Sequence, residues 1–121
     1  MEYESAVTVS SEARPGLELR VARMSFGRRL ELMKRVRELA RRVEFHEAST
    51  DPRERMDAGL LRAEIDRMFV LWGVLSVEGL SVDGQAATAA VLADRGPEDV
   101  FHEALAAVRK ETGLTEEERK N

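Results

Sequence analysis

Two segments of the chain, VEFHEAST and DVFHEALA, share a Phe-His-Glu-Ala tetrad that begins like a metalloprotease helix motif. The motif His-Glu-x-x-His places two imidazoles on one helix face, where both bind one zinc ion and the glutamate serves as general base. Neither copy has the second histidine, because Thr50 follows His46 by four residues and Ala106 follows His102 by four. Adjacent helix residues also diverge by about 100°, so His102 and Glu103 cannot chelate one ion together. We expect both histidines to be surface residues, with no metal and no cofactor bound.

Carboxylates in the region 54–66 are the other candidates for chemistry, and they do not form a pair. Laid out at about 100° per residue, they scatter around a helix. They are Glu54, Asp57, Glu64 and Asp66. General acid-base catalysis needs groups within mutual reach, and no nucleophile motif or glycine-rich phosphate loop accompanies these four. The sequence therefore favours a protein that is not an enzyme.

Composition indicates one folded domain spanning residues 1–121. Hydrophobic residues make up 43% of the 121 positions and charged residues 35%, a balance typical of a folded domain with a charged surface. No apolar run approaches the roughly 18 residues of a membrane helix, and the N-terminus lacks the pattern of a signal peptide. The absence of cysteine is compatible with a reducing compartment. We therefore predict a cytoplasmic protein without membrane association.

A β-hairpin is predicted over residues 5–23. Apolar residues alternate with polar ones on both sides of a turn at Pro15-Gly16, where proline presets one turn residue and glycine accepts the positive φ of the next. The alternating residues are Val7, Val9, Leu17, Leu19 and Val21. An isolated hairpin is marginal in water, so it must pack on another element.

A helical hairpin is predicted over residues 26–72. Ser25 is a suitable N-cap for the first helix, and Asp51 followed by Pro52 is typical of the start of the second. The predicted core half of the first helix comprises Phe26, Leu30, Leu32, Met33, Val36, Leu39, Ala40 and Val43. Its opposite half carries a charged stripe in which each charge is expected to pair with its neighbour, namely Arg28, Glu31, Arg35, Glu38 and Arg42. The apolar face of the second helix comprises Ala58, Leu61, Ile65, Met68, Phe69 and Trp72.

The remainder of the chain favours a short β element at 74–84 followed by helices over 88–121. Asp83-Gly84 is a turn signal, Thr88 is a suitable cap for a short helix, and Gly96-Pro97 ends that helix and begins the next. The apolar face of the next helix comprises Val100, Phe101, Ala104, Leu105 and Val108. A capping box at Thr115–Glu118 predicts the start of a further helix. The predicted fold class is α+β and mainly helical.

Basic residues outside the charged stripe give the first helix a surplus of positive charge. They are Arg29, Lys34, Arg37 and Arg41. Nucleic-acid binding is disfavoured, because Glu31 and Glu38 neutralise the stripe and no aromatic residue is interleaved there. Protein contact fits better, although the acidic chain from Val77 onward could instead attract the helix within one molecule. Trp72 is expected to pack in the core, with an interface hot spot as the sharper alternative.

The order of segments resembles the small tail-assembly chaperones and related tail accessory proteins of tailed bacteriophages and prophages. The resemblance is carried by PGLELRVARMSFGRRLELMKRVRELARRVEFHEA, by IDRMFVLWGVLSVEGLSVDGQAAT and by RGPEDVFHEALAAVRKETGLTEEERKN, which together cover nearly the whole chain. It implies a non-enzymatic cytoplasmic factor that keeps the tape measure protein soluble, helps to recruit tail tube subunits and is absent from the finished particle. In that setting we expect client contacts at Leu60 and Leu71, or at Trp72 and the basic face of the first helix.

Two other classes of function stay open. A structural component of the tail or head-tail region would form rings or tubes on its own. Self-association is possible for a chaperone as well as for a structural component. A small nucleic-acid-binding regulator would show affinity that falls steeply with salt.

Overall fold

The computed structural model describes residues 1–113, which form an α+β fold that is 58% helical, as predicted. The strands are β1 (Ala6–Ser10), β2 (Glu18–Ala22), β3 (Val74–Glu78), β4 (Ser81–Val82) and β5 (Gln85–Ala86). The helices are α1 (Phe26–Glu47), α2 (Pro52–Gly73), α3 (Ala89–Arg95) and α4 (Glu98–Thr112). The capping box predicted at 115–118 lies outside the described residues.

The predicted β-hairpin forms and gains a third strand. β1 and β2 pair antiparallel from Ala6↔Ala22 to Ser10↔Glu18, and β3 adds antiparallel to β2, giving the order β1-β2-β3. Gly16 has a φ of +89° in the turn between β1 and β2, as the Pro-Gly signal predicts. The third strand thus provides the packing partner that a lone hairpin needs.

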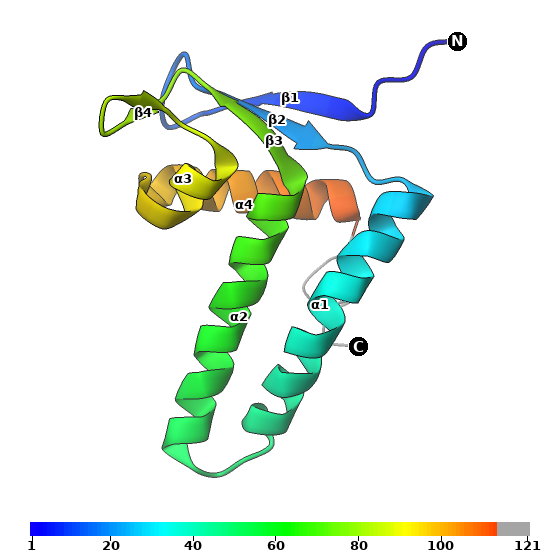
Figure 1. Cartoon of the computed structure of the whole chain (residues 1–121), viewed down its shortest axis with the longest axis vertical. Helices are drawn as coiled ribbons and strands as arrows, with labels where there is room; N and C mark the ends of the chain where they lie inside the picture. The colour runs from blue at the N-terminus through cyan, green and yellow to red at the C-terminus, as the bar shows by residue number, and fades with distance from the viewer. Residues whose placement is uncertain (114–121) are drawn as a thin grey trace.

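The core lies between this sheet and the helices, with α4 running beneath the sheet and across α2 (Figure 1). The largest fully buried side chains come from β2, α2, α3 and α4, namely Leu19, Val21, Val70, Leu92, Val100 and Val108. These elements contribute the apolar faces that their periodicity predicts, since Val100, Ala104, Leu105 and Val108 of α4 are all buried. The loop between β1 and β2 is attached to α4, because the Glu103 carboxylate accepts hydrogen bonds from Ser11 Oγ (2.9 Å) and from the Glu12 backbone N–H (3.2 Å).

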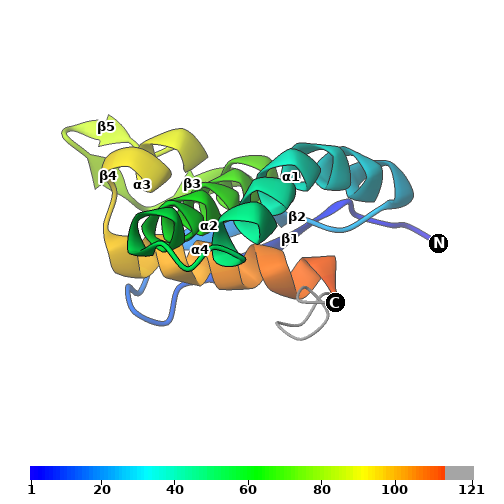
Figure 2. The same cartoon turned by 90° about the horizontal axis from the view of Figure 1, so that it is seen from below.

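The helices α1 and α2 form the predicted antiparallel hairpin, which extends away from the sheet (Figures 1 and 2). Both starts are capped as expected: Ser25 Oγ accepts from the Arg28 N–H at 3.2 Å, and Asp51 Oδ1 accepts from the Arg53 N–H at 2.9 Å. At the tip, an ion pair between Glu47 and Arg62 joins the end of α1 to α2. The far half of this hairpin projects beyond the layer formed by α4 (Figure 1).

The region after β3 contains a second small sheet and the short helix α3. β4 and β5 pair across Asp83-Gly84, whose φ values of 52° and 80° suit a tight two-residue hairpin turn. The predicted β element therefore extends two residues further than expected, to Ala86. Thr88 Oγ1 accepts from the Val91 N–H at 3.1 Å and caps α3, as predicted.

Candidate protein-contact surface

The helical hairpin carries most of the large apolar side chains that the described residues expose. On α1 and α2 these are Phe26, Leu30, Met33, Phe45, Met56, Leu60 and Leu71. Exposed apolar residues of this kind elsewhere in the described chain are Met1, Tyr3 and Leu75. Such a concentration on two neighbouring helices is typical of a surface that meets another protein.

The prediction that the whole apolar half of α1 lies in the core is wrong in part. Phe26, Leu30 and Met33 are 82%, 45% and 60% exposed, whereas Leu32 and Val43 are buried. The reason is that α1 packs mainly along α2, while α4 crosses α2 and does not cover the outer side of α1 (Figure 2). One neighbouring helix buries a narrower stripe than the half circumference that we predicted.

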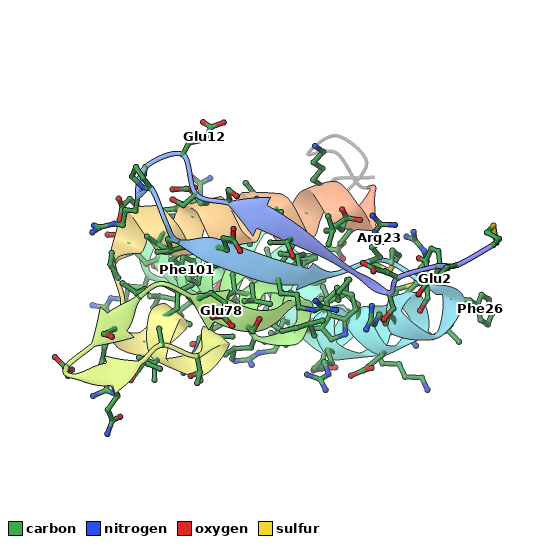
Figure 3. The ribbon with its side chains drawn as sticks, turned by 90° about the horizontal axis from the view of Figure 1, so that it is seen from above. Glu2, Glu12, Arg23, Phe26, Glu78 and Phe101 are labelled. Carbon is green, nitrogen blue, oxygen red and sulfur yellow. The ribbon has the colours of Figure 1, made fainter. Side chains whose placement is uncertain are left out.

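A separate exposed face therefore runs along α1, which we call the α1 outer face. Its apolar members recur at steps of four and three, and three basic residues continue it toward the tip. It consists of Phe26, Leu30, Met33, Lys34, Arg37 and Arg41. At about 100° per residue these six side chains fall within roughly 100° of arc. Figure 3 shows Phe26 at the margin of the molecule, pointing away from the rest of the fold.

The cations of the α1 outer face have no partners among residues 1–113. Within the described residues, no carboxylate lies within 4.0 Å of Lys34, Arg37 or Arg41, and none of these side chains forms a hydrogen bond. On the opposite stripe, Arg35 pairs with Glu31 at 2.8 Å, which confirms that predicted pair, whereas Glu38 and Arg42 form no ion pair within the described residues. The α1 outer face thus presents positive charge that no carboxylate of the described chain compensates, beside apolar side chains.

Two other basic residues of the first helix, Arg28 and Arg29, are engaged in the fold. Arg29 Nη2 donates to the carbonyl of Thr112 at 3.4 Å, at the end of α4, and Arg28 Nη1 donates to the carbonyls of Ser5 and Arg23. No ion pair joins α1 to the part of the described chain that begins at Val77. Within the described residues, the suggested attraction between the basic helix and the acidic half is therefore limited to the Arg29 contact with a carbonyl oxygen.

The predicted contact residues of α2 form a second surface. Leu60 and Leu71 are 66% and 40% exposed and lie about 20° apart around the helix. They turn away from α4, which α2 meets through Asp66 and Gly73. Trp72 is half-buried and packs against the core, as its structural interpretation predicted.

Sequence reasoning missed Phe26, Leu30 and Met33 as contact candidates, although a signal for them exists. The stripe Leu32, Val36, Leu39 and Val43 already repeats at steps of four, three and four. This stripe alone suffices to pack α1 against one other helix. Apolar residues in excess of such a stripe indicate a second apolar face.

The candidates for chemistry are dispersed or engaged in structure. His102 is exposed, as predicted, with Nε2 3.5 Å from Glu98 Oε1. His46 is half-buried rather than fully on the surface, and its Nδ1 has no hydrogen-bond partner in the described chain. Asp66 is paired with Arg109 of α4. Within residues 1–113, no three metal-ligating side chains converge on a common point.

Within the described residues, no helix combines the length and the apolar character required to cross a membrane. Comparison with protein-family models, with curated proteins and with solved structures finds no match to this chain.

Proposed function

We propose that this protein is a non-enzymatic chaperone of phage tail assembly, which binds the tape measure protein or the tail tube protein through its helical hairpin. The observation that supports this proposal is the row of exposed apolar side chains on α1 and α2, at the part of the fold that projects beyond the sheet and α4. The resemblance of the sequence to tail-assembly chaperones supplies the kind of client.

The physical basis is the burial of apolar faces on helical clients. A long helical protein exposes an apolar stripe until its own partners arrive, and such a stripe packs well against another helix. Leu60 and Leu71 on α2 and the apolar half of the α1 outer face provide two such helical surfaces. Because these side chains are exposed already, they can bind a client without unfolding the core.

Co-expression with tape measure and tail tube proteins from the same genome tests the proposal. We expect the client to stay soluble and to co-elute with the chain in size-exclusion chromatography with light scattering. The double variant Leu60→Ser and Leu71→Ser should lower the recovered soluble client, whereas Leu75→Ser on β3 serves as the matched control because Leu75 is an exposed leucine outside the hairpin.

Other results would contradict the proposal. If both clients stay insoluble and the purified chain alone forms large regular rings or tubes, the protein is a structural component of the particle. If the chain instead binds DNA or RNA with affinity that falls steeply with salt, the protein is a nucleic-acid-binding regulator.

A further inference from the structure

We infer that the α1 outer face binds an acidic amphipathic helix of the partner protein, running antiparallel to α1. This inference deepens the proposed function by giving the chemistry of the bound segment, and it rests on that function only for the identity of the partner. It is carried by the exposure of Phe26, Leu30 and Met33 and by the charges of Lys34, Arg37 and Arg41, which have no ion pair within residues 1–113.

The apolar part of the face has the geometry of a helix-packing ridge. Phe26, Leu30 and Met33 are separated by four and three residues, so they line one side of two successive turns. From Phe26 to Arg41 the face is about 22 Å long at 1.5 Å per residue. A partner helix of about 15 residues matches that length, and its own apolar stripe would cover these three side chains.

The positive charge of the α1 outer face favours an acidic partner. Each of the three cations is exposed and lacks a carboxylate within 4.0 Å in the described chain, so acidic side chains on the partner can pair with them without breaking an existing ion pair. Pairs at such a rim contribute modest affinity, but they accelerate association and exclude basic partners. A second copy of this chain docking α1 against α1 supplies no carboxylate to these cations: a parallel pair would bring like charges together, and an antiparallel pair would place the cations opposite the apolar half of the face.

The order of residues along α1 gives the orientation. The apolar residues occupy the N-terminal part of the α1 outer face and the cations the part nearer the tip. A partner running antiparallel would place its own N-terminal half opposite Lys34, Arg37 and Arg41. Carboxylates are favoured in the first turns of a helix, where the dipole is positive, and disfavoured in the last turns. In an antiparallel partner, the same acidic residues therefore interact favourably with the partner's own helix dipole and with the α1 cations.

The probe is a fluorescent helical peptide with glutamates in its N-terminal half and a leucine stripe continuing into its C-terminal half. A second peptide carries lysine at each glutamate position, and a third carries the glutamates in the C-terminal half instead. Fluorescence anisotropy with the full chain should rank the first peptide above the third and the third above the second. The affinity of the first peptide should fall as salt is raised, because rim charges are screened.

Charge reversal on α1 provides the matched comparison. The triple variant Lys34→Glu, Arg37→Glu and Arg41→Glu should weaken binding of the first peptide at least about tenfold, which corresponds to about 1.4 kcal/mol. The control Arg42→Glu, Arg53→Glu and Arg67→Glu makes the same change in net charge at exposed residues outside the face and should weaken binding by less than about threefold. Phe26→Ser with Met33→Ser should also weaken binding, and circular dichroism melting verifies that each variant folds.

Equal binding of the lysine peptide, failure of every peptide to bind, or equal loss in the two charge variants would each overturn the inference. Displacement of the peptide by a short DNA duplex at comparable concentration would overturn it in favour of nucleic acid. The two proposals fail separately. If the acidic peptide binds at α1 but the tail clients stay insoluble, the proposed function is wrong; if the α1 triple variant still keeps the clients soluble, this inference is wrong.

Discussion

Gly73, the last residue of α2, lies directly against Val108 of α4. A Cβ atom placed on Gly73 would be 2.6 Å from Val108 Cγ1 and 2.7 Å from Val108 Cγ2. Carbon atoms in favourable contact are about 3.5–4.0 Å apart, so the crossing of the two helices requires glycine at this position. This close approach occurs where α2 passes into β3, and it therefore connects the helical hairpin to the sheet and to α4.

We expect Gly73→Ala to lower the free energy of unfolding by about 1–3 kcal/mol, because the added methyl group overpacks the contact with Val108. Gly59→Ala in the same helix meets nothing within 4 Å and should raise that free energy by about 0.5–1 kcal/mol through helix propensity. Urea denaturation measures both. The double variant Gly73→Ala and Val108→Ala should be less destabilised than the sum of its single changes, and strict additivity would refute the steric explanation.

The pairing of Asp66 with Arg109 predicts a second stability difference. Both side chains are less than one-third exposed, the pair is made by Arg109 Nη2, and the buried Nε of Arg109 has no hydrogen-bond partner in the described chain. Asp66→Ala should cost about 1–3 kcal/mol of unfolding free energy, since it leaves a partly desolvated guanidinium unpaired. Glu31→Ala removes the half-exposed pair with Arg35 and should cost about 0.3–0.5 kcal/mol. Thermal melting of both variants gives the comparison, and equal costs would contradict it.

The carboxylate of Glu103 predicts a local effect on the loop between β1 and β2. Glu103→Ala removes acceptors for the Ser11 hydroxyl and the Glu12 N–H, so we expect a loss of about 1–3 kcal/mol. Amide hydrogen exchange of Glu12 should become faster, while exchange in α2 changes only with global stability. Glu98→Ala removes an exposed carboxylate of the same helix and is the control; its Glu12 exchange should match that of the unchanged chain.

Two adjacent residues of α1 test the division between its buried and exposed apolar faces. Leu32 is 5% exposed and Met33 is 60% exposed. Leu32→Ala should lower the unfolding free energy by about 2–5 kcal/mol through the cavity that it leaves. Met33→Ser should change it by no more than about 0.5 kcal/mol, because an exposed side chain loses little burial. Similar losses in the two variants, measured by urea denaturation, would show that the α1 outer face is covered.

The local signals of the sequence determined where most elements begin, turn and end. Ser25, Asp51 and Thr88 cap their helices as predicted, because a capping hydrogen bond joins residues only two or three positions apart. The turn at Pro15-Gly16 likewise depends on backbone preferences of its own residues. The α+β class was predictable for the same reason. Apolar residues at every second position indicate a strand, those at steps of three and four indicate a helix, and each pattern depends on the geometry of one element.

Tertiary structure decided which of these elements meet, and with that the character of the candidate surface. The pairing of β3 with β2 and the contact of Gly73 with Val108 join residues far apart in the chain, and no local pattern specifies them. The apolar residues of α1 could all have been core if a second helix had covered them. Because α4 crosses α2 instead, Leu32 is buried while Phe26 and Met33 stay exposed, and only the packing of whole helices determines that difference.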